Sequence, residues 1–368
     1  MEDSKQGRIK PCTLTLIFGD TPMFQILSLK NGLDNVQGFF NGSTNVGLRT
    51  KPNEDGSLDG DVAFIRSNEP CDVAARFTTN RFAAAPIKHF QRYPKDFQTN
   101  FILINAKNAN AMTGIKGIED IDTLFAKLES KTKLHNPIMS STGVIGYRLP
   151  LDKLASAFDN FDFNARDSEK TARAIMTTDS FKKEICFKVT LDDGNSFHIA
   201  AIAKGAGMIN PAMATMLCFI VTDADIPKED MDELLGIAVE NSFNRISVDG
   251  DTSTNDTVLL LANKTSMVYD KDAFREALNK ITFELAMMIL RDGEGATKVV
   301  AFEVKGAAND EDAKKASILL SNSLLVKTAL FGEDPNWGRI ASTIGAVSYT
   351  HLRAHETVLD LVCRLLLE

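Results

Sequence analysis

Residues 196–220 read SFHIAAIAKGAGMINPAMATMLCFI, and the rest of the chain is organised around them. Residues 196–203 carry alternating and β-branched apolar side chains, and residues 216–221 form a continuous apolar run, so each segment predicts a strand. The loop between them holds glycines, small residues and Pro211. Glycines allow the backbone a positive φ and a close approach to another group. The stretch therefore predicts two strands of a buried sheet joined by a tight loop.

The loop ends in one hydroxyl, that of Thr215, between Ala214 and Met216. This hydroxyl lies next to the Ala214 carbonyl along the chain and is able to attack it once that carbonyl is polarised. Cleavage there leaves Thr215 as a new N-terminus with a nucleophile and an amine base on one residue. The alternative is a purely structural threonine at the start of a strand, which local chemistry alone favours.

Composition excludes several classes of function. The 368 residues are 44% hydrophobic and 24% charged, which is typical of a globular protein. The net charge of −8 argues against nucleic acid as the main partner, because phosphate binding needs a positive surface. No apolar run approaches the length of a membrane helix. The five scattered cysteines predict reduced thiols in a reducing compartment, without a disulfide framework or a metal site.

Three further motifs accompany the loop at 204–220. They are RFTTNRFAAAPI at 76–87, FNRISVDGDTSTND at 243–256 and GEDPNWGR at 332–339. Together, in this order, they closely resemble the ornithine acetyltransferase family, also called glutamate N-acetyltransferases, whose members cleave themselves before a threonine. The resemblance runs from about Gly47 to Gly345.

The resemblance implies a two-stage chemistry. Thr215 first attacks the Ala214 carbonyl, and the chain separates into an α part and a β part. The freed Thr215 then takes an acetyl group from N-acetylornithine and passes it to glutamate through an acetyl-threonine. No metal or organic cofactor is required, because the acetyl donor is itself a substrate. Some members also use acetyl-CoA, and the resemblance leaves both types open.

The resemblance also assigns the oxyanion hole to Thr142 and Gly143, within SSTGVIG at 140–146. Such a site needs hydrogen-bond donors placed where negative charge develops, and an unhindered glycine backbone suits that demand. Read without the family, Thr-Gly before an apolar pair predicts only a strand with a flexible entry.

Three residues are expected, by the same resemblance, to hold the charged ends of the substrate: Lys204, Thr178 and Glu294. A lysine suits a carboxylate as a compact point charge. Glu294 stands between two glycines and is assigned to the substrate amine, and Thr178 is preferred over Thr177. The family usually has glycine where this chain has Lys107.

The loop at 247–256 holds three carboxylates, which could indicate a divalent cation. It lacks the closing glutamate of a calcium loop, so we expect a turn that supports the active site instead. His351 and His355 have helical spacing, but without a third ligand they predict no zinc site.

The expected fold is α/β, with mixed β-sheets sandwiched by helices in two lobes that meet near Thr215. Residues 272–291 and 311–331 predict helices, and 299–304 predicts a strand. The chain divides into an extension of unclear role (1–45), an α-chain region (46–214), an incomplete β-chain region (215–346) and a tail (347–368). The tail departs from the family pattern and resembles non-native sequence joined to a shortened gene.

Family members assemble as α2β2 after cleavage, and we expect the same here, in the cytoplasm or, for a eukaryotic source, in the mitochondrial matrix. Two alternatives remain from the sequence. One is an N-terminal-nucleophile hydrolase or aminopeptidase of related fold, which gives the acyl group to water. The other is an inactive, uncleaved, truncated product.

Overall fold

The computed structural model describes residues 24–210 and 216–347 of the chain. These residues contain one nine-stranded mixed sheet, in the order β1-β6-β7-β8-β9-β3-β4-β5, with β2 paired to β3 off this path. The pairs β4–β5 and β8–β9 are parallel, and the other pairs are antiparallel. The strands are β1 (Phe24–Leu29), β2 (Phe39–Thr44), β3 (Val62–Phe77), β4 (Gln98–Asn105), β5 (Ile138–Ser141), β6 (Lys183–Leu191), β7 (Ser196–Lys204), β8 (Leu217–Thr222) and β9 (Thr257–Ala262).

The two strands predicted around the glycine-rich loop are β7 and β8, at the middle of the sheet. They pair antiparallel from Ile199↔Thr222 to Lys204↔Leu217, so the loop joins neighbouring strand ends. Every residue of β8 is buried, as its continuous apolar sequence requires. Ala214 and Thr215 belong to residues 211–215, which lie outside the described part of the chain.

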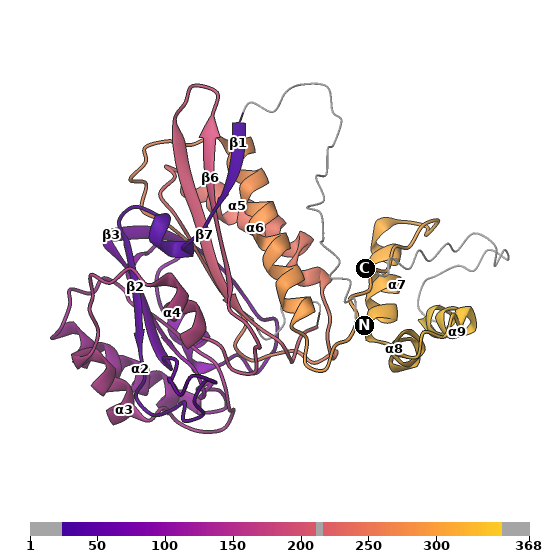
Figure 1. The fold of residues 1–368 in the computed structure, drawn as a ribbon, viewed down its shortest axis with the longest axis horizontal. Helices are drawn as coiled ribbons and strands as arrows, with labels where there is room; N and C mark the ends of the chain where they lie inside the picture. The colour runs from indigo at the N-terminus through magenta and orange to yellow at the C-terminus, as the bar shows by residue number, and fades with distance from the viewer. Residues whose placement is uncertain (1–23, 211–215, 348–368) are drawn as a thin grey trace, which may run out of the picture.

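Helices cover both faces of the sheet, and this confirms the α/β prediction. Successive side chains of a strand point to opposite faces, and alternate residues of β4 and β8 accordingly join different cores. One face packs against α4 and η1, while the other packs against α5 and α6 at one end and against α2 and α3 at the other. In Figure 1, α6 runs alongside β6 and β7, and α2 and α3 lie below β2.

The helices are α1 (Ala85–Phe90), α2 (Gly114–Glu129), α3 (Leu151–Ser156), α4 (Ser168–Ala174), α5 (Lys228–Asn241), α6 (Lys271–Arg291), α7 (Asp310–Asn322), α8 (Leu324–Phe331) and α9 (Trp337–Val347), with 3-10 turns η1 (Gly32–Asn35), η2 (Ala157–Asp159) and η3 (Phe243–Arg245). None of them is long and apolar enough to cross a membrane, within the ranges that the structure describes.

The C-terminal helices α7, α8 and α9 form a group beside the sheet (Figure 1). Two expectations for this region are wrong. The helix predicted over 311–331 is broken at Ser323, whose hydroxyl caps α8 by accepting from Val326 N at 3.3 Å. The strand predicted over 299–304 is absent, because none of the described strands pairs with it.

The helical group meets the sheet next to the glycine-rich loop. Asn322, the last residue of α7, donates to the side-chain oxygen of Asn210 at 2.9 Å and accepts from the Ser247 hydroxyl. Lys327 of α8 donates to the Val248 carbonyl at 2.7 Å. The helices therefore contact both the loop that leads to Thr215 and the carboxylate-rich loop at 247–256.

Candidate active site

Two carboxylates of the 247–256 loop bind the backbone on either side of residues 211–215. Asp249 accepts from Ile209 N at 2.9 Å and from Met208 N. Asp256 accepts from Met216 N at 3.0 Å through Oδ1. The expected supporting turn is thus bonded to both flanks of the segment that contains Ala214 and Thr215.

Lys204, the last residue of β7, is buried, with 2% of its surface exposed. Its Nζ lies 4.0 Å from Asp179 Oδ2. Burial lowers the pKa of Lys204, and the Asp179 carboxylate acts in the opposite direction. When charged, this ammonium is desolvated, and a desolvated charge interacts more strongly with a neighbouring anion than an exposed one does.

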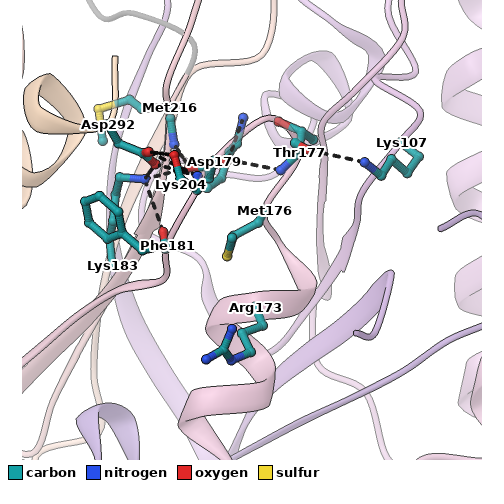
Figure 2. Close-up of polar contacts among 12 residues, drawn as sticks. Lys107, Arg173, Met176, Thr177, Asp179, Phe181, Lys183, Lys204, Met216 and Asp292 are labelled. Atoms are coloured by element: carbon teal, nitrogen blue, oxygen red, sulfur yellow. Dashed lines mark hydrogen bonds and ion pairs between the residues drawn. The ribbon is translucent and has the colours of Figure 1, made fainter. Parts of the chain in front are cut away.

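Asp179 is a site residue that the sequence does not single out. Its side chain lies 2.8 Å from Lys183 Nζ and accepts from Gly205 N at 2.6 Å and from Thr177 N at 3.0 Å (Figure 2). Burial alone would raise the pKa of Asp179, but Lys204 and Lys183 hold it down at about 2. Asp179 is therefore a permanent anion at neutral pH.

Glu294 follows α6 and lies against the same loop as Lys204. Its N–H donates to the Ala206 carbonyl at 2.9 Å. A Cβ on Gly207 would lie 2.6 Å from Glu294 Oε1, so the missing side chain at Gly207 makes room for this carboxylate. The fold thus brings Lys204 and Glu294, which are far apart in sequence, to the same short loop.

Thr142 and Gly143 follow β5, the strand at the far end of the sheet order from β1. Thr142 is 3% exposed and donates its N–H to the Asn105 carbonyl at 3.0 Å. Gly143 has a φ of +133°, and a Cβ there would lie 2.2 Å from the carbonyl carbon of Lys107. Any side chain at 143 would therefore force this turn to shift.

Asn255 connects the Thr142–Gly143 turn to the rest of the site. Its buried amide nitrogen donates to the Ala109 carbonyl at 2.6 Å and to the Ser141 carbonyl at 2.8 Å. The next residue, Asp256, holds Met216 N. Two consecutive side chains therefore bind the expected oxyanion turn and the residue that follows Thr215.

Thr178 lies between Thr177 and Asp179 and is exposed. Figure 2 shows Lys107 on the opposite side of Thr177 from the Asp179 group, with its Nζ 3.2 Å from the Thr177 carbonyl oxygen. Lys107 has a φ of +70°, the left-handed region that favours glycine. This conformation explains why glycine is usual at that position of the family.

The sequence thus misses three buried polar residues that hold the site together, namely Asp179, Asn255 and Asp256. Each sits in a segment that the sequence does single out, beside Thr178 or within the 247–256 loop. The one signal available was a charged or amide side chain directly before a strand that is apolar after its first residue, as Asp256 precedes β9.

Asp256 offers a test of the site by pH. Its Oδ2 is buried, and burial raises the pKa of its carboxyl well above the usual range, against the Met216 N–H and the side chains of Ser253 and Thr78. A carboxyl whose pKa is higher in the folded than in the unfolded chain takes up a proton on folding. It therefore lowers the free energy of unfolding as the pH rises above 3.8, the ordinary pKa of this carboxyl.

Asp256→Asn removes that titration and keeps an oxygen for Met216 N. We expect its free energy of unfolding to exceed that of the wild type at pH 7, with a difference that grows above pH 4 by up to about 1.4 kcal/mol per pH unit. Urea unfolding at pH 4, 5.5 and 7 measures this. The matched control is Asp251→Asn, which removes an exposed carboxylate of the same loop, where water screens the charge. A difference for Asp256→Asn that is constant with pH would contradict the assignment.

Comparison with known proteins identifies the family of the chain. The chain matches the model of the ArgJ family over residues 42–365. It is 57% identical over 325 residues to the arginine biosynthesis bifunctional protein ArgJ of Wolinella succinogenes, covering 88% of this chain and 81% of that protein. It is 43% identical over 284 residues to the glutamate N-acetyltransferase of Methanothermobacter thermautotrophicus, covering 76% and 70%.

Among solved structures, the arginine biosynthesis bifunctional protein argJ of Bacillus halodurans matches with a TM-score of 0.46 and 26% identity, covering 53% of this chain and 99% of that one. The family match includes residues 347–365, where the sequence predicts a departure from the family; that boundary stays a prediction. With the match spanning most of its length, the chain belongs to the ArgJ family.

Proposed function

We propose that the chain cleaves itself between Ala214 and Thr215 and then transfers the acetyl group of N2-acetylornithine to glutamate, in arginine biosynthesis. Family membership and the names of the relatives support this acyltransferase chemistry. The observation that carries the site is the pair Asn255–Asp256. It ties the Thr142–Gly143 turn to the residue that follows Thr215.

In the first stage, Thr215 Oγ attacks the Ala214 carbonyl carbon, its proton passes to the Thr215 nitrogen, and the amide bond to that nitrogen breaks, which gives an ester and a free amine. Water then hydrolyses that ester and releases the Ala214 carboxylate. The new α-amine of Thr215 is the base for the second stage, as in other nucleophiles that lie at an N-terminus.

In the second stage, the Thr215 amine takes the hydroxyl proton while Oγ attacks the acetyl carbonyl. Thr142 and Gly143 donate to the oxyanion of the tetrahedral intermediate. The amine of ornithine leaves with the proton, and the acetyl group remains as an ester on Thr215. The amine of glutamate then attacks this ester by the same steps in reverse and frees the hydroxyl. Lys204 holds the substrate carboxylate, and Thr178 and Glu294 contact the remainder of the amino acid.

The test is product analysis of the purified protein with N2-acetylornithine, with and without glutamate. With glutamate, we expect continuous release of ornithine together with an equal amount of N-acetylglutamate. Without glutamate, ornithine release is expected to stop at about one equivalent per active site, because the acetyl group stays on Thr215. Release of acetate at the same rate without glutamate would instead favour a hydrolase. A third sample contains acetyl-CoA and glutamate. The bifunctional type makes N-acetylglutamate from these two substrates, and the monofunctional type does not.

We also propose that the cleaved chains assemble as α2β2 and work in a reducing compartment, the cytoplasm or the mitochondrial matrix. The described cysteines Cys71, Cys186 and Cys218 are free and buried. Burial raises the pKa of Cys71 and of Cys186 to about 12, so these thiols are unreactive at neutral pH. Light scattering of the cleaved protein tests the assembly.

A further inference from the structure

Lys183, the first residue of β6, is a fully buried lysine. Its Nζ lies 2.8 Å from Asp179 Oδ1 and 2.6 Å from Asp292 Oδ2, and 4.8 Å from the centre of the Phe181 ring (Figure 2). A buried ammonium is costly unless it is paired and hydrogen-bonded. Lys183 is therefore held at a defined point, and it fixes the positions of two carboxylates from different parts of the chain.

Asp179 connects Lys183 to Lys204, the residue that is proposed to bind the substrate carboxylate. It accepts from Gly205 N at 2.6 Å, and its Oδ2 lies 4.0 Å from Lys204 Nζ. Both contacts are made at the end of β7, where the chain leaves the sheet. The position of the Lys204 ammonium thus depends on Asp179, which in turn depends on Lys183.

Asp292 connects Lys183 to the loop that carries Glu294. It is the residue at the end of α6, where its oxygens accept from Ser180 N at 3.0 and 3.1 Å and from the Ser180 hydroxyl. Glu294 is two residues further on and is bonded through its N–H to Ala206. Asp292 therefore anchors the short loop that carries Glu294.

We infer that Lys183 is a positioning residue that fixes the separation between Lys204 and Glu294, and through it the length of the diamino acid that fits between them. The inference rests on the proposed function, in which Lys204 meets the substrate carboxylate, and it adds that Glu294 meets the side-chain amine of ornithine. Lys183 itself is enclosed by Asp179, Asp292 and Phe181 and acts through these partners. A substrate one methylene longer than ornithine is then discriminated against by the rigid spacing.

The test uses the double variant Lys183→Met/Asp292→Asn. In the wild type, the formal charges of Lys183, Lys204, Asp179 and Asp292 cancel, and the double variant removes one of each sign, so Asp179 and Lys204 still balance. The matched control is Lys264→Met/Asp72→Asn. This control removes the ion pair between Lys264 and Asp72, which are 2.7 Å apart, with the same two kinds of substitution. The pair lies at the opposite end of β9 from Asp256.

Intact mass first reports whether each protein cleaves, and then kcat and KM are measured for N2-acetylornithine and N2-acetyllysine. For the double variant we expect cleavage to persist, KM for N2-acetylornithine to rise by about tenfold, and the preference for N2-acetylornithine over N2-acetyllysine to fall by about tenfold or more. The control is expected to keep the wild-type preference. An unchanged preference in a folded, cleaved double variant would overturn the inference, since a purely structural Lys183 would not set the ratio.

Two further measurements keep the outcomes distinct. If the double variant does not fold, the single variant Asp292→Asn is measured instead, because it retains the pair of Lys183 with Asp179. We expect it to shift the substrate preference in the same direction by a smaller factor. No shift in this variant would overturn the inference. If the wild type shows no acetyl transfer, the proposed function fails. The inference is then judged by calorimetric binding of ornithine and lysine, where equal affinities in the wild type would overturn it.

Discussion

Replacing Thr215 by alanine is expected to leave one full-length chain and to abolish acetyl transfer. Alanine has no hydroxyl to attack the Ala214 carbonyl, so neither the cleavage nor the acetyl-threonine forms. The uncleaved chain also lacks the α-amine that serves as the base. Loss of a nucleophile costs on the order of 10⁶-fold in kcat in the best-studied hydrolases. Denatured intact mass and the formation of N-acetylglutamate measure the two effects.

Thr215→Ser is the matched control for this experiment, because serine keeps the hydroxyl and the N-terminal amine. We expect it to give the two fragments 1–214 and 215–368 and to transfer acetyl more slowly than the wild type. A wild-type protein that shows only the full-length mass would exclude self-cleavage. Cleavage at the same bond in Thr215→Ala would exclude Thr215 as the nucleophile.

Replacing Gly143 by alanine is expected to lower acetyl transfer by about 10²- to 10³-fold, the usual effect of losing one oxyanion donor. The new Cβ would lie 2.2 Å from the Lys107 carbonyl carbon and 2.5 Å from Asn108 N, both of which are backbone atoms. The turn must therefore shift, and the φ of +133° is unfavourable for alanine in any case. Self-cleavage passes through the same kind of oxyanion, so it is expected to slow as well.

Gly146→Ala separates the clash from the conformational cost. Gly146 lies three residues further along the same turn, with a φ of +95°, and a Cβ added to it would have no atom of the described residues within 4 Å. It bears the cost of alanine at positive φ without displacing the backbone at 107–108. We expect this variant to cleave and to transfer acetyl at close to the wild-type rates. Equal losses in the two variants would show that general strain, and not the oxyanion turn, accounts for the effect.

Local sequence determined the centre of the sheet and the identity of the family. Strands β7 and β8 follow from alternating and continuous apolar residues, because burial in a sheet imposes those patterns on the residues themselves. The same reasoning failed for residues 299–304, whose apolar side chains have no neighbouring strand in the described sheet. It failed again at Ser323, since a capping hydroxyl competes with helix continuation only where the fold turns the chain.

Only the tertiary structure decided how the site is held. Lys183 and Asp292 are 109 residues apart in sequence and form a buried ion pair, although charged residues of this kind are usually exposed. Asn255 bonds to the Ser141 carbonyl, 114 residues away. Such pairings leave no periodic trace in the sequence, because each joins elements that meet only once the sheet and its helices have packed together. The sequence therefore determined the chemical groups of the site, and the folded sheet determined which buried charges position them.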